Sequence, residues 1–286
     1  MNKLTDYNYI QDLLLRNGFR FSRSMGQNFL KEDWVPSAIA EAADLDENSC
    51  VVEVGPGIGC LTRELSERAG RVISYELDKT LMPILAETLA GCENVEVVFR
   101  DFMKESPQSI REACGGESAR FVANIPYNIT SPLLTKVIEL GFDEIIVMIQ
   151  KEVAKRICAR AGQSDYSAFG IFCQWHTEPE ILFEVGRNCF VPQPKVDSAV
   201  IRLRKCPPPV EVGDEKLLFS LIRASFNQRR KTFVNAVSSG IGLDKEMTAE
   251  VLRNLGYDEK IRGEVLTIGD FAKISDEIGS IIARDL

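Results

Sequence analysis

Histidine is almost missing from this sequence, and cysteine never occurs in closely spaced pairs. The 286 residues contain a single histidine, His176, and eight cysteines, none of which forms a C-x-x-C pair. Zinc sites are usually built from clustered residues of these two types. We therefore expect no metal site, a structural role for His176, and cysteines that are reduced and buried.

Long apolar runs and an excess of positive charge are missing as well. No hydrophobic stretch approaches the roughly 18 residues of a membrane span, and Asp6, Gln11 and Asp12 interrupt any signal-peptide core. We expect a cytoplasmic protein that does not bind membranes. With 34 Lys and Arg against 42 Asp and Glu, the net charge is -8, which argues against a protein that coats nucleic acid unselectively.

Positive charge is instead concentrated in one segment. Lys216 to Asn235 contains five cationic side chains and no acidic one, and its pattern predicts a single helix. A basic face on an acidic protein indicates docking on a specific polyanion. An ordinary solvated helix face stays open as the alternative for this segment taken alone.

The N-terminal sequence predicts an amphipathic helix, opened by Thr5 and closed by Gly18, and a short helix near residues 35–43. After them, short apolar segments alternate with helical patterns. The predicted strands are "CVVEVG" (50–55), "RVISYEL" (71–77), "VEVVFR" (95–100), "RFVANIP" (120–126) and "DEIIVMIQ" (143–150). This alternation predicts an α/β fold, a doubly wound, Rossmann-like parallel sheet.

A proline run marks the end of this region. Two further strands are expected at residues 177–185 and 197–204, after which Pro207 to Pro209 can continue neither a ladder nor a helix. The remaining sequence is helical in pattern. We expect a catalytic domain over residues 1–206 and a small all-α domain over residues 210–286.

A glycine-rich turn follows the first predicted strand. In "VVEVGPGIGCLTREL", Gly55, Gly57 and Gly59 lie between a strand and a helix, where the backbone can turn tightly and approach a ligand. A dinucleotide fingerprint has glycine at the position of Cys60, so that version fits poorly. Glu53, two residues before the first glycine, is typical of S-adenosylmethionine sites.

Acidic residues end the next two strands. Glu76 can accept hydrogen bonds from ribose hydroxyls, and Asp101 can accept one from an adenine amino group, with Phe102 packed on the ring. Each acid alone could be a helix cap or a surface charge. Together with the glycine turn they predict a nucleotide site at one edge of the sheet.

The fourth strand ends in "NIPY", Asn124 to Tyr127. An aromatic amine is a poor nucleophile, and hydrogen-bond acceptors that hold its protons can direct its lone pair at an activated methyl group. Asn124 offers a side-chain carbonyl and Pro126 a peptide carbonyl, while Tyr127 offers a face on which a base can stack. Out of context the same four residues could be a simple strand-ending turn.

These motifs resemble, over nearly the whole chain, the KsgA/RsmA family of small-subunit ribosomal RNA adenine dimethyltransferases. The matching segments are "GQNFL" (26–30), "VVEVGPGIGCLT" (51–62), "YELD" (75–78), "RDFM" (100–103), "NIPYNITSPLL" (124–134), "MIQKEVAKRI" (148–157), "FVPQPKVDSAVIRL" (190–203) and "SFNQRRKTFVN" (225–235). Ile125 stands where leucine is commoner, a near-isosteric change.

The resemblance implies the fold, cofactor and substrate. It implies a class I methyltransferase domain whose S-adenosylmethionine contacts are Asn28, Leu30, Gly55, Glu76, Asp101 and Asn124, with Phe190 flanking the target adenine opposite Tyr127. It also implies a product with two adjacent adenines, each dimethylated at N6, near the 3′ end of 16S ribosomal RNA in an immature 30S subunit. We expect a monomer.

Three groups of cationic residues are candidate phosphate contacts, which position RNA without reading its sequence. They are Arg16, Arg20, Arg23 and Lys31 near the N-terminus, Lys151, Lys155, Arg156 and Arg160 in the middle, and Arg223, Arg229, Arg230 and Lys231 in the helical region.

Three other functions stay open. A large-subunit ribosomal RNA adenine methyltransferase of the antibiotic-resistance type would share the glycine turn and N-x-P-Y, although the segments at 190–203 and 225–235 look more like the small-subunit family. A non-catalytic ribosome assembly factor could keep the fold, but Glu76, Asp101 and Asn124 are all present. An NAD oxidoreductase is disfavoured by Cys60.

Overall fold

The chain forms two compact units. The structure, a computed structural model, describes residues 3–20, 27–115 and 119–284. The first unit comprises Met1–Ala154 and Glu178–Lys205, and the second comprises Lys155–Thr177 and Cys206–Leu286. The sequence placed a boundary after residue 206, whereas Lys155–Thr177 groups with the C-terminal helices.

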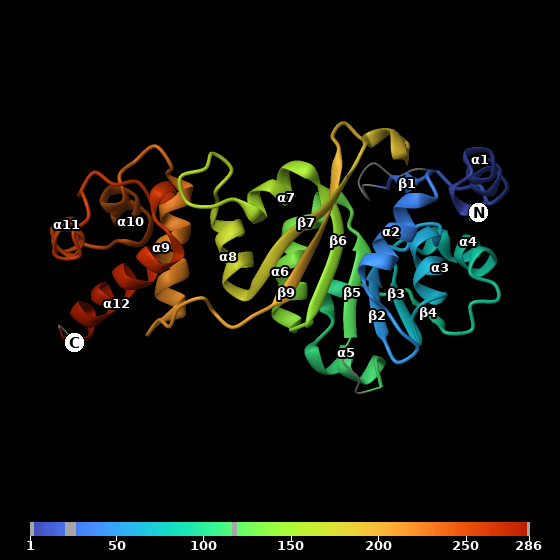
Figure 1. Cartoon of the computed structure of the whole chain (residues 1–286), viewed down its shortest axis with the longest axis horizontal. Helices are drawn as coiled ribbons and strands as arrows, with labels where there is room; N and C mark the ends of the chain where they lie inside the picture. The colour runs from blue at the N-terminus through green and yellow to red at the C-terminus, as the bar shows by residue number, and fades with distance from the viewer. Residues whose placement is uncertain (1–2, 21–26, 116–118, 285–286) are drawn as a thin grey trace. The chain divides into compact units, whose positions relative to one another are not determined.

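The first unit is built on one sheet that, in the described residues, has seven strands in the order β4-β3-β2-β5-β6-β9-β7 (Figure 1). The strands are β2 (Cys50–Val54), β3 (Arg71–Tyr75), β4 (Val95–Val98), β5 (Ala119–Asn124), β6 (Glu144–Gln150), β7 (Thr177–Val185) and β9 (Ser198–Lys205). The five from β2 to β6 are parallel, and β9 pairs antiparallel with β6. The predicted α/β fold is confirmed.

The strand order creates a topological switch point between β2 and β5. The chain moves outward from β2 to β3 and β4 through α3 (Cys60–Ser66) and α4 (Met82–Thr88). It then returns to the centre through α5 (Pro107–Ala113) and moves the other way through α6 (Thr130–Leu140). In such sheets ligands bind outside the carboxyl ends of the strands at the switch point.

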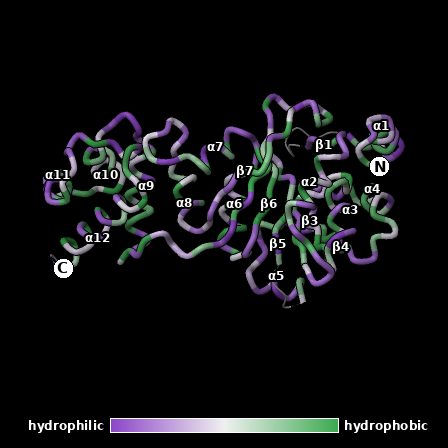
Figure 2. Tube along the Cα trace, viewed as in Figure 1, coloured by the Kyte–Doolittle hydropathy of each residue, from purple (hydrophilic) through white to green (hydrophobic). Residues whose placement is uncertain are grey.

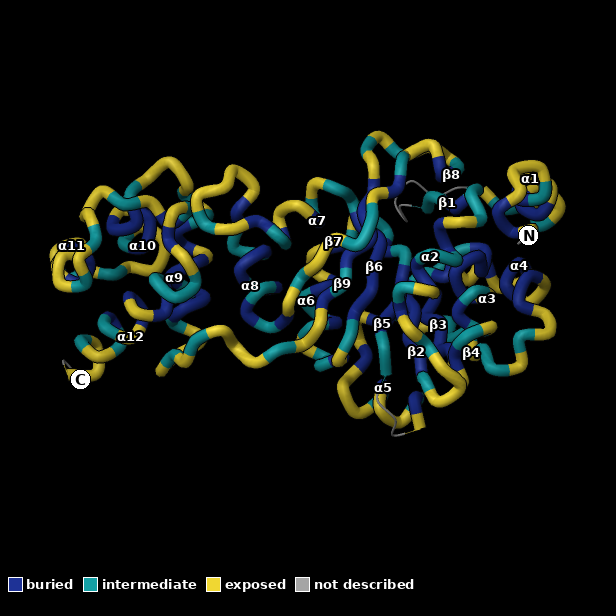
Figure 3. The backbone as a smooth tube through the Cα atoms, viewed as in Figure 1, coloured by how far each residue is buried: buried dark blue, intermediate teal, exposed yellow. Residues whose placement is uncertain are grey.

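The strands are held by burial on both faces. β6 is apolar except at its ends and is buried over most of its length (Figures 2 and 3). On one face α2 (Trp34–Ala42) places Val35 and Ile39 in a cluster with Leu61 and Leu65 of α3 and with strand residues. Near-continuous apolar strands are what a parallel sheet covered on both faces requires.

The N-terminal segment packs beside the glycine turn. A short η1 (Lys3–Thr5) leads to α1 (Tyr7–Arg16), and both contribute to a cluster that includes Ile58 and Cys60. The expectation that Thr5 opens this helix is wrong: the cap is Asp6, whose carboxylate accepts from the N–H of Tyr9, and a carboxylate is as good a helix cap as a hydroxyl.

A small antiparallel ladder joins two motifs that are far apart in the sequence. Strand β1 (Phe29–Leu30) pairs with β8 (Phe190–Val191), so that Leu30 lies opposite Phe190. This pairing brings the "NFL" motif and the start of "FVPQPKV" to one place.

The second unit is helical. Its helices are the end of α7 (Lys151–Cys158), α8 (Ala168–His176), α9 (Glu215–Asn227), α10 (Phe233–Ile241), α11 (Lys245–Asn254) and α12 (Ile268–Arg284). Tyr166, Ile171 and Trp175 share one core with Phe219 and Phe271. That shared core explains why Lys155–Thr177 belongs with helices that begin 38 residues after its end.

The basic segment is not one helix, so that prediction is wrong. Helix α9 ends at Asn227, and Gln228 departs from helical geometry with φ -130° and ψ 50°. Helix α10 begins after Thr232, whose hydroxyl accepts from the N–H of Asn235. Arg229, Arg230 and Lys231 therefore lie in a turn.

Candidate active site

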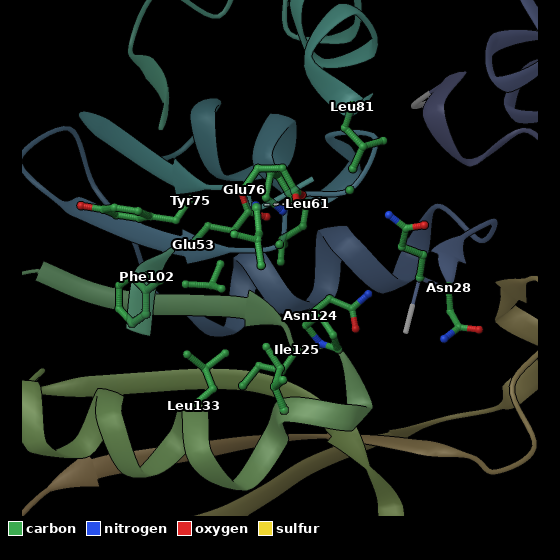
Figure 4. Close-up of a pocket in the computed structure, with 18 of the residues that line it drawn as sticks. Asn28, Glu53, Leu61, Tyr75, Glu76, Leu81, Phe102, Asn124, Ile125 and Leu133 are labelled. Carbon is green, nitrogen blue, oxygen red and sulfur yellow. Dashed lines mark hydrogen bonds between the residues drawn. The ribbon is translucent and has the colours of Figure 1, made fainter. Parts of the chain in front are cut away.

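A cavity of about 350 Å³ lies at the carboxyl ends of the strands, at the switch point (Figure 4). Its wall is formed by β1, the turn after β2, the ends of β3, β4 and β5, and β8. The sequence-predicted cofactor and catalytic residues that line it are Asn28, Leu30, Gly55, Gly57, Glu76, Asp101, Phe102, Asn124, Pro126, Tyr127 and Phe190. The fold thus brings all of these residues to one cavity from six separate segments of the chain.

The glycine turn passes close to its neighbours. Gly57 has φ +60°, and a Cβ there would lie 3.1 Å from Cε1 of the Phe29 ring. A side chain at this position would therefore strain the backbone and displace β1.

Glu53 lies beneath this turn and is almost fully buried, with 1% of its surface exposed. The hydroxyls of Thr62 and Ser74 both donate to its Oε2, at 2.7 and 2.6 Å. Burial raises the pKa of the Glu53 carboxyl to about 7, against the effect of these two hydrogen bonds. The carboxyl can thus change protonation near neutral pH, because burial disfavours its charged form.

Glu76 follows β3 and is held by its own loop. Its Oε1 accepts from the N–H groups of Leu77 at 2.7 Å and Asp78 at 2.8 Å. Burial raises the pKa of the Glu76 carboxyl, while neighbouring backbone N–H groups lower it. Because one oxygen is fixed by the backbone, the direction of the other is fixed as well.

Asp101 follows β4 and caps the short helix η4 (Phe102–Lys104). Its Oδ1 accepts from the N–H of Met103 at 3.0 Å, so Asp101 is a helix cap, and its contact with a ligand stays a prediction. Phe102 is buried, with its ring edge-on to Tyr75 at 5.2 Å between ring centres. These rings form part of the apolar wall of the cavity.

The turn after β5 presents two oxygen atoms. In the described part of the chain the Asn124 carboxamide has no hydrogen-bond partner, and it lines the cavity (Figure 4). The Pro126 carbonyl accepts from the N–H of Ile129 at 3.1 Å, a contact that sequence reasoning missed. A carbonyl oxygen has two lone pairs, so one stays available to a ligand.

Tyr127 is fixed by a partner 71 residues away. Its hydroxyl lies 2.6 Å from Oγ of Ser198, the first residue of β9. Burial raises the pKa of the Tyr127 hydroxyl, while the hydrogen bond to Ser198 lowers it. The sequence motif indicated the aromatic ring but not Ser198, because the contact depends on the β6–β9 pairing.

The candidate RNA contacts differ in their surroundings. Lys155, Arg223, Arg230 and Lys231 are exposed. Lys151 forms an ion pair with Glu184 at 2.6 Å, and Arg229 donates to the Ser164 carbonyl at 2.9 Å and lies 3.4 Å from Glu264. Arg23 lies outside the described residues.

Two features are missing from the described ranges 3–20, 27–115 and 119–284. No group of three or more His, Cys, Asp or Glu side chains could hold a metal ion. No helix there combines the length and the apolar character that a membrane span needs.

Comparison with known proteins identifies the family. A model of the family described as ribosomal RNA adenine dimethylase matches residues 18–278. The chain belongs to the ribosomal RNA adenine dimethylase family. The resemblance seen in the motifs is therefore confirmed.

Named relatives cover nearly the whole chain. The chain is 41% identical to ribosomal RNA small subunit methyltransferase A of Alkaliphilus metalliredigens, over 98% of this chain and 99% of that protein. It is 42% identical to the protein of the same name in Bacillus cytotoxicus, over 97% and 98% of the two chains.

Two solved structures share the fold. A dimethyladenosine transferase from Plasmodium falciparum matches with a TM-score of 0.68 and 27% identity, over 86% of this chain and 95% of that one. The 23S rRNA methyltransferase ErmE matches with a TM-score of 0.66 and 29% identity, over 88% and 99%. Both are similar to this chain in the α/β unit and beyond it, since each match covers more than four fifths of the chain.

Proposed function

We propose that this protein is an S-adenosylmethionine-dependent adenine-N6,N6-dimethyltransferase of small-subunit (16S) ribosomal RNA. It acts as a monomer in the cytoplasm on two adjacent adenines near the 3′ end of the RNA, in an immature 30S subunit. The observation that carries this proposal is that one cavity joins the glycine turn and its acids to the N-I-P-Y turn.

The residues present fit the cofactor. The cavity has the size and the mixed polarity of a small-molecule site, and the carboxylates of Glu76 and Asp101 suit ribose hydroxyls and an adenine amino group. Gly57 lies too close to Phe29 to carry a side chain. The glycine turn therefore presents its backbone to the ligand. The residues that would hold the cofactor are Asn28, Leu30, Gly55, Gly57, Glu76, Asp101, Phe102 and Asn124.

The chain's own part in the chemistry is to shape the acceptor amine. S-adenosylmethionine, when bound, supplies a methyl group that its cationic sulfur makes electrophilic. Oδ1 of Asn124 and the Pro126 carbonyl accept hydrogen bonds from the N–H groups of the adenine amino group, which draws the nitrogen toward tetrahedral geometry. Neutral acceptors suffice because the amine needs orientation more than deprotonation.

The target base needs a platform outside the RNA helix. The Tyr127 ring is held at its hydroxyl by Ser198, and Phe190 is buried in the wall of the same cavity. Stacking on such rings contributes about 1 to 3 kcal/mol per base. A ring fixed before the RNA arrives loses little conformational freedom on binding.

The relatives favour the small-subunit substrate. The proteins at 41 and 42% identity carry the name of a small-subunit methyltransferase, and their alignments cover 98 and 97% of this chain. The 23S rRNA methyltransferase is 29% identical. An assembled subunit is the better substrate than free RNA, because base extrusion needs a folded and partly splayed target.

Transfer of labelled methyl groups tests the proposal. Purified protein is incubated with small and with large ribosomal subunits from a strain that lacks the modification, and the methylated nucleotides are mapped. We expect label in small subunits only, on two adjacent adenines as N6,N6-dimethyladenine. Label on the large subunit, or on no subunit, contradicts the proposal.

A further inference from the structure

We propose that Gln27 and Asp78 are positioning residues that close one wall of the cofactor cavity. The proposal deepens the function proposed above and rests on it. In sequence the two residues lie within two of the matching motifs, "GQNFL" and "YELD": Gln27 directly precedes Asn28, and Asp78 follows Glu76 by two positions.

A hydrogen bond joins these two distant segments. Nε2 of Gln27 donates to Oδ2 of Asp78 at 2.7 Å, across 51 residues of chain. Gln27 itself lines the cavity. The bond therefore ties the residues leading into β1 to the loop that follows β3, on either side of the space where a ligand binds.

Asp78 passes this restraint to Glu76. Its N–H donates to Oε1 of Glu76 at 2.8 Å, while its own Oδ1 accepts from the N–H of Thr80 at 3.0 Å and from the Thr80 hydroxyl at 2.6 Å. Both carboxylate oxygens of Asp78 are thus engaged, one by its own loop and one by Gln27. A shift of this loop would turn the oxygen of Glu76 that faces a ligand.

Other contacts hold the N-terminal segment independently. The Thr5 hydroxyl donates to Asp33, and Sγ of Cys60 donates to the Leu4 carbonyl at 3.0 Å. Breaking the Gln27–Asp78 bond should therefore loosen the cavity wall without detaching the segment. A charge-assisted hydrogen bond of this kind is stronger than a neutral one, so its loss should be measurable in ligand affinity.

A charge reversal with rescue tests the pair. Gln27→Glu sets a carboxylate against Asp78, and Asp78→Asn in that background restores the bond with its direction reversed, since the Asn amide can donate to Glu. Gln27→Leu removes the bond without adding charge. Gln108→Glu is the matched control, because Gln108 also donates to a carboxylate, Glu112 at 2.8 Å, on the surface of α5.

Affinity for S-adenosylmethionine is measured by calorimetry with each protein. We expect the dissociation constant to rise roughly tenfold in Gln27→Glu and severalfold in Gln27→Leu, and to return to within about threefold of wild type in the double variant. Gln108→Glu should bind as wild type does. KM for the cofactor should rise while kcat at saturation stays within about twofold, as expected for a residue that positions without contacting the reacting atoms.

Hydrogen exchange of the protein without cofactor gives an independent measurement. Amides at residues 27–33 and 76–82 should exchange faster in Gln27→Glu and recover in the double variant, whereas a general loss of stability would raise exchange throughout the unit. The pairing is overturned if the wild-type protein binds S-adenosylmethionine and Gln27→Glu binds it equally well. It is also overturned if the double variant does not regain affinity. A wild-type protein that does not bind S-adenosylmethionine overturns the proposed function itself.

Discussion

At the end of β5, the Asn124 carboxamide faces the cavity without a hydrogen-bond partner in the described part of the chain. The residue is half-buried. An amide left open at the switch point of a sheet is therefore available to a ligand. Its neighbour Pro126 has one carbonyl lone pair engaged by Ile129, which fixes the direction of the other.

Asn124→Ala should abolish methyl transfer and weaken cofactor binding only modestly. In the proposed mechanism the carboxamide acts mainly on the acceptor amine, and its removal leaves the glycine turn and Glu76 in place. Loss of one such acceptor costs about 100- to 1,000-fold in kcat or more. Labelled-methyl transfer and calorimetry measure the two effects, with exposed Asn48→Ala as control. Wild-type turnover in Asn124→Ala would remove the role assigned to the residue.

Glu53 makes stability depend on pH. Its folded pKa of about 7 lies above the unfolded value near 4.5, so its stabilising contribution is fully present below pH 4.5 and is lost as pH rises through 7. Glu53→Gln stays neutral. The quantity to compare is the free energy of unfolding of the variant minus that of wild type. This difference should be about 1 to 3 kcal/mol larger at pH 8.5 than at pH 5.

Urea unfolding at the two pH values measures this difference. Glu47→Gln, an exposed glutamate seven residues before the end of β2, is the control. The account fails if Glu53→Gln differs from wild type by the same amount at both pH values.

At the scale of elements, the five parallel strands were predictable and the break between α9 and α10 was not. Each strand from β2 to β6 is a short apolar run ended by a polar or glycine residue, a local pattern that the sequence shows directly. The break between α9 and α10 has no glycine or proline. Thr232 caps α10 and so marks the break. Helix propensity alone favours a continuous helix through "NQRRK" just as well, so the local sequence does not decide between the two.

Thr232→Ala should destabilise the helical unit. The Thr232 hydroxyl accepts from the N–H of Asn235 at 3.4 Å and from its side-chain amide at 2.9 Å. Loss of such a cap costs about 1 kcal/mol. Thermal unfolding should show a lower midpoint for Thr232→Ala, and little change for Ser238→Ala, which removes a hydroxyl from the middle of the same helix. Equal midpoints for the two variants would mean that the cap does not stabilise α10.

At the scale of the whole molecule, the sequence indicated the cavity residues but not the contacts between distant segments. Asn28, Glu76, Asp101 and Asn124 lie in motifs that a reader can find by eye. The Tyr127–Ser198 and Gln27–Asp78 contacts depend on strand order, and the grouping of Lys155–Thr177 depends on a core shared with distant helices. Such long-range packing leaves no periodic signal in the sequence.

The turn between α9 and α10 provides the last prediction, which concerns RNA binding. Arg229 is engaged by Ser164 and Glu264, so its reversal would also disturb the fold of the unit. Arg230 and Lys231 are exposed, and within the described residues their side chains have no partner. They are the cleaner candidates for phosphate contacts.

Reversing Arg230 and Lys231 to Glu should weaken binding to small subunits by about tenfold or more and leave cofactor affinity unchanged. Two lost phosphate contacts should also lower the slope of log affinity against log salt by roughly 1.5 to 2. Binding is measured across a salt series, with Lys245 and Lys260 reversed together as a control that changes the net charge equally in the same unit. If both double variants lose affinity alike, the overall charge attracts RNA and this turn has no specific part. If only the first pair does, the α9–α10 turn contacts the RNA backbone and helps hold the subunit while the target adenine enters the cavity.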